Sequence, residues 1–170
     1  MKVSEITNEL VANYMRLDFA SMTDAEKAEL TVLLAIAKAF VKSYTGLKDV
    51  SPEDEVVGAG DGVKTKFALD YYPVKAASRK IYIDKVEQTE TTDYALDDDI
   101  GRITFVTTPA NGVEITASYS AVPTDGFEDF VIVVYILVQD MYDNRTLYVD
   151  KNNLNKVVDM TLGMHSTNYL

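Results

Sequence analysis

The chain has 170 residues but no cysteine, no tryptophan and only one histidine. Without cysteine it has no disulfide framework, no thiolate nucleophile and no cysteine-based zinc or iron–sulfur site. A single histidine also excludes a metal site, or a reaction mechanism, that needs two histidines from one chain. We therefore expect no cofactor and no resident metal ion.

Basic residues are few, because 16 lysines and arginines stand against 27 aspartates and glutamates, which gives a net charge of −11. Tight nucleic-acid binding requires basic side chains that neutralise phosphates, and docking on an anionic membrane requires the same sign of charge. Long apolar runs are also missing: the longest, Phe130 to Val138, is about half of what a bilayer crossing needs. With no secretory signal at the N-terminus, we expect a soluble, cytoplasmic chain.

Hydrophobic residues make up 47% of the chain and charged residues 25%, as in ordinary globular domains. The spacing of apolar residues in 1–55 predicts a short helix over 3–15 and a longer helix after it. The longer helix begins at Thr23 and Glu26, which form a capping-box pattern, and ends at Gly46.

Helical spacing returns after Pro123 and continues from Phe127 to Tyr142. A weaker last helix is predicted over 154–162, with Val157 and Val158 facing inward. The tail 163–170 shows no periodicity, and we expect it to be mobile before it binds a partner.

Residues 56–122 favour strands instead. Five short strands are predicted, at 64–69, 79–84, 94–97, 102–106 and 114–120. Asn111-Gly112 predicts a tight turn between the last two. The fold class is therefore α+β: a helical domain made of 1–55 and 123–170, with an inserted antiparallel β-sandwich or small barrel at 56–122.

The two long helices are apolar on nearly all sides, which indicates burial on several faces. The covering partner is either a second copy of the chain or the rest of one small bundle, and both interpretations stay open. Arg145 either complements the C-terminal dipole of its helix or forms an ion pair with a neighbouring subunit. The candidate subunit contacts are Val32, Ile36, Ala39, Ile132, Tyr135, Ile136 and Arg145.

Motifs that carry chemistry are incomplete. The glycines of 58–62 precede a strand and lack the Gly-Lys-Ser/Thr of a phosphate-binding loop, so we interpret them as a turn. Asp97–Gly101 fails the ligand spacing of an EF-hand, and we interpret it as an acidic turn. His165 is an interface or exposed histidine rather than a general base. No nucleophile, base and oxyanion set can be assembled, so we expect no enzyme.

The helical segments resemble phage head–tail connector proteins. The resemblance is carried by Ala39-Phe-Val-Lys-Ser-Tyr-Thr-Gly46, by the apolar segment Val131–Arg145 that ends in Tyr-Asp-Asn-Arg, and by Leu162-Gly-Met-His-Ser166. The insert resembles a small β module of phage structural proteins through Ile81-Tyr-Ile-Asp84 and Gly101-Arg-Ile-Thr-Phe105. In that module a glycine usually follows the aspartate, whereas this chain has Lys85, so the turn type stays open.

The resemblance implies a structural virion protein of the neck, made in the host cytoplasm, that forms a ring of twelve copies on the portal. It implies that the ring extends the DNA channel without sequence-specific DNA binding and joins a downstream neck, stopper or tail protein. The C-terminal segment is implied to reach the portal. The corresponding candidates are Leu162, Met164, His165, Asn168, Tyr169 and Leu170.

A second hypothesis makes the chain a receptor- or carbohydrate-binding module of a phage tail or neck. Exposed aromatic side chains in the β insert would be its signature. Alternating strand positions could equally bury these rings. The available tyrosines are Tyr71, Tyr72, Tyr82, Tyr94 and Tyr119.

Overall fold

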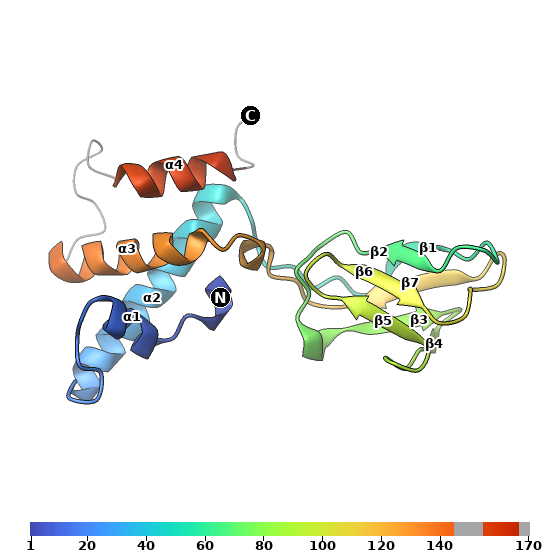
Figure 1. Cartoon of the computed structure of the whole chain (residues 1–170), viewed down its shortest axis with the longest axis horizontal. Helices are drawn as coiled ribbons and strands as arrows, with labels where there is room; N and C mark the ends of the chain where they lie inside the picture. The colour runs from blue at the N-terminus through green and yellow to red at the C-terminus, as the bar shows by residue number, and fades with distance from the viewer. Residues whose placement is uncertain (145–154, 167–170) are drawn as a thin grey trace. The chain divides into compact units, whose positions relative to one another are not determined.

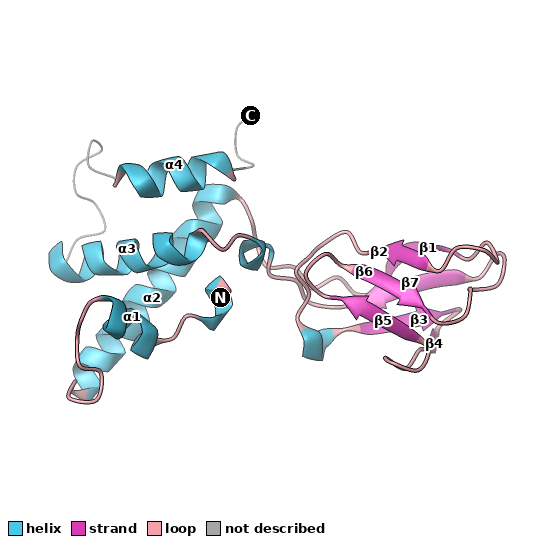
Figure 2. Ribbon diagram, in the orientation of Figure 1, coloured by secondary structure: helices cyan, strands magenta, loops and turns pink. Residues whose placement is uncertain are grey.

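The computed structural model describes residues 1–144 and 155–166. It forms two compact units, drawn in Figure 1: a helical unit, Met1–Lys48 with Phe127–Leu170, and a β unit, Asp49–Gly126. The α-helices lie in the first unit and the β-strands in the second, which confirms the α+β class (Figure 2). The β unit begins before residue 56 and ends after 122, because Val50 and Ala121 pair in an antiparallel bridge that extends it.

The helical unit contains four α-helices and one 3₁₀ turn in its described residues. These are η1 (Val3–Glu5), α1 (Asn8–Tyr14), α2 (Asp24–Thr45), α3 (Phe130–Asn144) and α4 (Lys156–Met164). None of these helices is long and apolar enough to cross a membrane. Helix α2 packs against the other three, and α3 also contacts α1 and α4.

The boundaries of α2 follow the local sequence. At its start the Thr23 hydroxyl accepts a hydrogen bond from the Glu26 N–H (3.3 Å), and Glu26 accepts one from the Thr23 N–H (2.7 Å). This capping box satisfies backbone donors that the first turn leaves free. At its end Gly46 has φ +78°, a left-handed conformation that glycine adopts without strain. Both predicted ends are confirmed.

The prediction of one continuous helix over 3–15 is wrong. The structure has η1, an extended Ile6, and then α1. Thr7 caps α1 by accepting a hydrogen bond from the Leu10 N–H (3.3 Å), so a new helix begins where the pattern predicted the middle of one. A threonine that bonds to a nearby backbone N–H favours a helix start over a helix interior.

One apolar core lies inside the helical unit. Its fully buried side chains include Leu30 and Val41 of α2, Phe130 and Val134 of α3, and Leu162 of α4. Residues far apart in the chain thus meet through apolar stripes at helical spacing. Burial of this kind supplies most of the stability of short helices, which are marginal alone.

The β unit contains two open antiparallel sheets that share one core. One has the order β1-β7-β3-β4 and the other β2-β6-β5. Two 3₁₀ turns, η2 (Ala76–Ser78) and η3 (Pro123–Gly126), lie outside the sheets. The strands are β1 (Glu55–Ala59), β2 (Lys66–Ala68), β3 (Lys80–Ile83), β4 (Val86–Glu87), β5 (Tyr94–Asp97), β6 (Arg102–Phe105) and β7 (Glu114–Ser118).

The five predicted strands are all present, but the sequence did not indicate β1 and β4. Strand β1 includes Gly58, at a shift in register with β7, and glycines lower the strand signal. The predicted loop therefore begins at Gly60, where a side chain would overlap the Ala110 carbonyl oxygen. Strand β4 has only two residues, too few for an alternating pattern.

The predicted tight turn at Asn111-Gly112 is present, with the Val113 N–H donating to the Ala110 carbonyl oxygen (3.4 Å), but it does not join paired strands, because β6 and β7 belong to different sheets. Of the two residues, Gly112 alone has positive φ (+86°). A hairpin turn joins the paired strands β3 and β4, and its residues Asp84 (φ +47°) and Lys85 (φ +67°) occupy left-handed positions. Two consecutive positive φ values are the signature of a type I′ hairpin turn, so Lys85 stands where glycine is usual.

The two ends of the β unit meet, which predicts that the helical unit survives without it. Val50 and Ala121 exchange two backbone hydrogen bonds (3.1 and 2.9 Å). Replacing residues 50–125 by a short Gly/Ser linker should leave a helical protein with a cooperative melt, because loop length changes closure entropy slowly. Circular dichroism beside the full-length chain measures this. An unfolded or insoluble product would show that the two units share one folding core.

Candidate functional site

The C-terminal helix α4 presents two apolar faces. Val158 and Leu162, four residues apart, are fully buried in the core of the helical unit. Val157, Met160 and Met164, at i, i+3 and i+7, follow the opposite side and are 52%, 69% and 72% exposed. The prediction that Val157 faces inward is therefore wrong, and the helix carries a solvent-exposed apolar stripe that we name the α4 stripe.

Polar contacts hold α4 in place at both ends. The Asn155 side chain caps its start by accepting a hydrogen bond from the Val157 N–H (3.0 Å). The Tyr44 hydroxyl of α2 donates to Asp159 (2.7 Å), and the Ser166 hydroxyl donates to the Tyr44 carbonyl oxygen (3.2 Å). Because these contacts join α4 to the end of α2, the helix is positioned by the helical unit itself.

His165 lies against the start of α3. Its Nε2 is 2.9 Å from the Asp129 carboxylate, and its ring lies 4.4 Å from Phe127 and 5.2 Å from Phe130, centroid to centroid. The expectation of an aperiodic tail from residue 163 onward is wrong for Gly163 and Met164, which continue α4. Sequence analysis did not identify Asp129 as the partner of His165, because no local pattern indicates a pairing between residues 36 positions apart.

The portal-contact candidates therefore differ in accessibility. Met164 is exposed and His165 is half-buried, whereas Leu162 is fully buried in its own chain. Asn168, Tyr169 and Leu170 lie outside the described residues.

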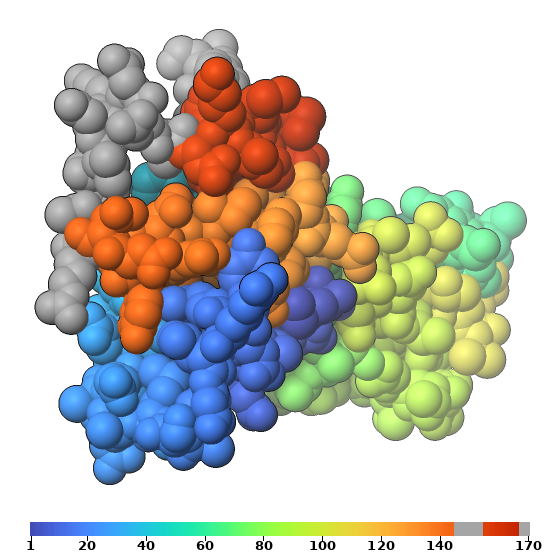
Figure 3. Space-filling model, turned by 60° about the vertical axis from the view of Figure 1, so that its left-hand side comes forward, coloured from blue at the N-terminus to red at the C-terminus, as the bar shows by residue number. Residues whose placement is uncertain are grey.

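The inter-subunit candidates also divide. Val32 and Ala39 of α2 and Ile132 of α3 are exposed, and Ile36 and Ile136 are half-buried. Figure 3 shows the face of the helical unit on which α1, α3 and α4 lie next to one another.

Tyr135 and Arg145 are the remaining inter-subunit candidates. Tyr135 is buried inside the unit, where its ring stacks on Tyr14 at 4.9 Å, and burial raises the pKa of its hydroxyl. Arg145 lies outside the described residues.

The β unit is tied together by one arginine that the sequence analysis did not single out. Arg79, whose side chain is 10% exposed, precedes β3 and reaches residues on either side of β5 in the other sheet. It donates to both oxygens of Asp98 (2.6 Å each) and to Glu90. Burial would lower the pKa of Arg79, but the hydrogen bond to Glu90 and the charge of Asp98 outweigh it and raise the pKa.

Asp98, part of the acidic turn, thus has a structural partner within the chain. No group of three histidine, aspartate or glutamate side chains in residues 1–144 and 155–166 is arranged to hold a metal ion. The glycine loop after β1 leads into β2 without an intervening helix, which leaves no helix N-terminus for a phosphate there.

The tyrosines of the β unit fall into three groups. Tyr71 and Tyr72 are exposed, Tyr82 is half-buried, and Tyr94 and Tyr119 are buried. The Tyr119 hydroxyl donates to Glu55 (2.7 Å) and accepts a hydrogen bond from the Tyr71 N–H (3.1 Å). Burial and the bond to Glu55 raise the pKa of Tyr119. Its hydroxyl therefore joins two segments of the β unit.

No family model matches this chain, and no curated protein matches it. Among solved structures, it is similar to a chain of the neck of an empty gene transfer agent particle computed with C6 symmetry, with 16% identity and a TM-score of 0.47. It is also similar to a chain in the virion of a native gene transfer agent particle, with 15% identity and a TM-score of 0.48. Each likeness covers 99% of this chain and 92% of the other.

Proposed function

We propose that the chain is a structural protein of a phage-like particle, a head–tail connector that assembles as a ring on the portal vertex. The observation that carries the proposal is the α4 stripe of Val157, Met160 and Met164, on a helix whose other face is already buried. The helical core is complete without these three side chains. A contiguous exposed apolar patch of this kind is typical of a protein interface.

Further exposed apolar side chains lie on the other helices of this unit. Leu10 belongs to α1, Val32 to α2 and Ile132 to α3. We assign Val32 and Ile132 to contacts between neighbouring copies in a ring of twelve. We assign the α4 stripe to the portal, in line with the resemblance of the C-terminal segment to connector proteins.

The charge of the chain suits passage of DNA rather than its retention. At a net charge of −11, an acidic channel wall repels phosphates, so DNA slides through without sequence-specific binding. The ring then serves as a platform for a downstream neck, stopper or tail protein. No catalytic role is part of the proposal.

Mass photometry of the purified protein, alone and with the portal protein of the same particle, tests the ring. We expect small species alone and a discrete ring complex on the portal. Absence of any complex under conditions where both proteins are folded would contradict the proposal. Negative-stain microscopy of the complex then gives the copy number.

Substituting Val157→Glu should abolish portal binding and leave the fold intact. The side chain is exposed, and a glutamate in the first turn of a helix is favourable, so stability should change by no more than about 0.5 kcal/mol. A charge within an apolar contact, by contrast, must be desolvated without a partner. Co-sedimentation with portal measures the loss.

Val63→Glu is the matched control, because Val63 is also exposed but lies in the β unit. It should bind portal as the unmodified chain does. Equal binding by both variants would exclude the α4 stripe from the portal contact.

A further inference from the structure

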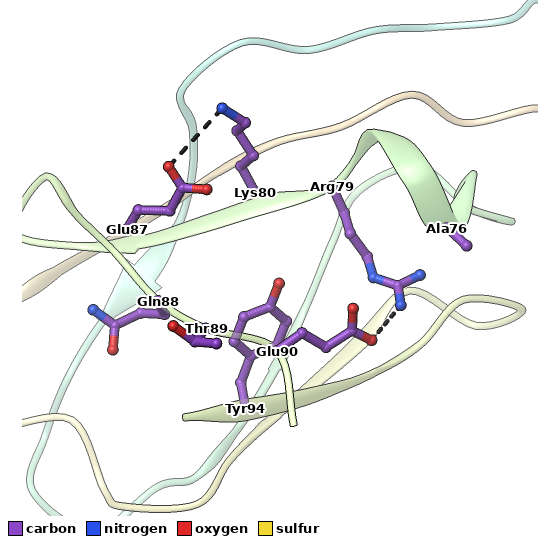
Figure 4. Close-up of a pocket in the computed structure, with 8 residues that line it drawn as sticks. All are labelled: Ala76, Arg79, Lys80, Glu87, Gln88, Thr89, Glu90 and Tyr94. Atoms are coloured by element: carbon purple, nitrogen blue, oxygen red, sulfur yellow. Dashed lines mark hydrogen bonds and ion pairs between the residues drawn. The ribbon is translucent and has the colours of Figure 1, made fainter. Parts of the chain in front are cut away.

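The β unit has a pocket of about 430 Å³ beside Arg79, within the size range of small-ligand sites. Both sheets contribute to it, since Lys80 and Glu87 come from β3 and β4 and Tyr94 comes from β5 (Figure 4). The connection between β4 and β5 completes the wall. The full lining is Ala76, Arg79, Lys80, Glu87, Gln88, Thr89, Glu90 and Tyr94.

The Tyr94 hydroxyl has no hydrogen-bond partner among the residues that the structure describes, 1–144 and 155–166. The residue is only 2% exposed, and its ring packs near Phe105 in the core. Figure 4 shows the hydroxyl pointing into the space between Arg79 and Lys80.

The Tyr94 hydroxyl can both donate a hydrogen bond to a ligand and accept one from it. Burial, and to a lesser extent the charge of Glu90, raise the pKa of Tyr94, so the group keeps its proton at neutral pH. A protonated phenol both donates and accepts a hydrogen bond. The Tyr94 hydroxyl is not among the fully buried side-chain atoms that lack a partner in the described residues, so a ligand in the pocket can reach it and take the place of water there.

The four charged side chains that line the pocket, Arg79, Lys80, Glu87 and Glu90, sum to zero, and Asp98 lies outside the lining. Arg79 is matched by Glu90 and Asp98, and the Lys80 ammonium lies 3.9 Å from Glu87. A charged ligand gains little net attraction here, and an apolar ligand leaves the polar lining unpaired. What the lining offers is a mixture of donors and acceptors: the Tyr94 and Thr89 hydroxyls, the Gln88 amide, the Lys80 ammonium and two carboxylates.

We propose that this pocket binds a saccharide, one neutral sugar ring of a glycan chain. Each sugar hydroxyl both donates and accepts, which matches a lining where carboxylates accept and ammonium, amide and hydroxyl groups donate. A sugar hydroxyl supplies the partner that Tyr94 lacks. The site is independent of the ring contacts proposed for the helical unit and gives the β unit a role of its own.

The test uses the full-length protein, labelled with ¹⁵N, and four free sugars: D-glucose, D-galactose, L-rhamnose and N-acetyl-D-glucosamine. At millimolar concentrations at least one should shift the backbone amide signals of Thr89, Glu90 and Tyr94. Sulfate and free lysine, as charged probes, should not shift them. Absence of any sugar response, or a response to the charged probes alone, overturns the proposal.

The variant Tyr94→Phe removes only the hydroxyl and should weaken binding of the responding sugar about tenfold, the effect of one hydrogen bond to a buried group. Its melting temperature should not fall, because the hydroxyl has no partner to lose. Tyr82→Phe is the matched control. Tyr82 lies beside a different hollow of about 480 Å³ on the four-stranded sheet, lined also by Asp54 and Val56. A loss of binding in Tyr82→Phe, with none in Tyr94→Phe, overturns the assignment.

Discussion

Replacing Arg79 by methionine is expected to lower the free energy of unfolding of the β unit by about 3 kcal/mol. Breaking a buried ion pair costs roughly 3–5 kcal/mol, and the lower end applies because Asp98 and Glu90 are partly solvated. Methionine keeps most of the apolar stem but leaves two carboxylates without their shared cation. The segment before β3 then loses its polar contact with the residues on either side of β5.

Hydrogen exchange measures where this loss occurs. The amides of β5 and β6 should exchange faster, while those of α2 and α3 should keep their protection, because Arg79 and its partners Asp98 and Glu90 all belong to the β unit. Lys80→Met is the control: Lys80 is the next residue, but it is exposed and its ion pair with Glu87 is long. That change should cost about 0.5 kcal/mol or less. Equal losses in the two variants would disprove the special role of Arg79.

Leu162→Ala is expected to destabilise the helical unit by about 3 kcal/mol, within the roughly 2–5 kcal/mol seen for buried leucines. Leu162 is fully buried, and Val158 is the other fully buried side chain of α4. A helix of nine residues does not persist in water by itself, so it depends on these two anchors. We expect α4 to lose amide protection before the rest of the unit unfolds.

Met164→Ala on the same helix is the matched control, because that side chain is 72% exposed. Its effect on stability should stay within about 0.5 kcal/mol. The pair also separates two roles at the C-terminus. If portal binding is lost in Met164→Ala at unchanged stability, the α4 stripe makes the contact. If Leu162→Ala leaves the α4 amides fully protected, the anchoring role is wrong.

The two proposed sites divide the functions between the units. The helical unit has exposed apolar side chains on α2, α3 and α4, which we assign to contacts with other proteins. The β unit supplies a polar, charge-balanced pocket that suits a neutral sugar. The ring experiment tests only the connector proposal, and the sugar titration tests only the pocket. A negative result in one therefore leaves the other proposal standing.

Local sequence determined the features that depend on neighbouring residues. Thr23 and Glu26 define the start of α2 and Gly46 its end, because caps act within one turn of a helix. The change from helical spacing to strand signals near residue 56, and back after residue 122, follows in the same way from patterns a few residues long. These patterns suffice for an α+β class and for the existence of most elements.

Tertiary structure alone decided how the elements pair. Val157 and Val158 are both apolar, and only packing against α2 and α3 buries one and exposes the other. The Asn111-Gly112 turn joins different sheets because β7 finds its partners in β1 and β3, a choice that no local signal contains. Arg79 with Glu90 and Asp98, and His165 with Asp129, meet across long stretches of chain. Packing of the apolar cores, and no local pattern, brings these charged side chains together, so the candidate sites were the least predictable part of this protein.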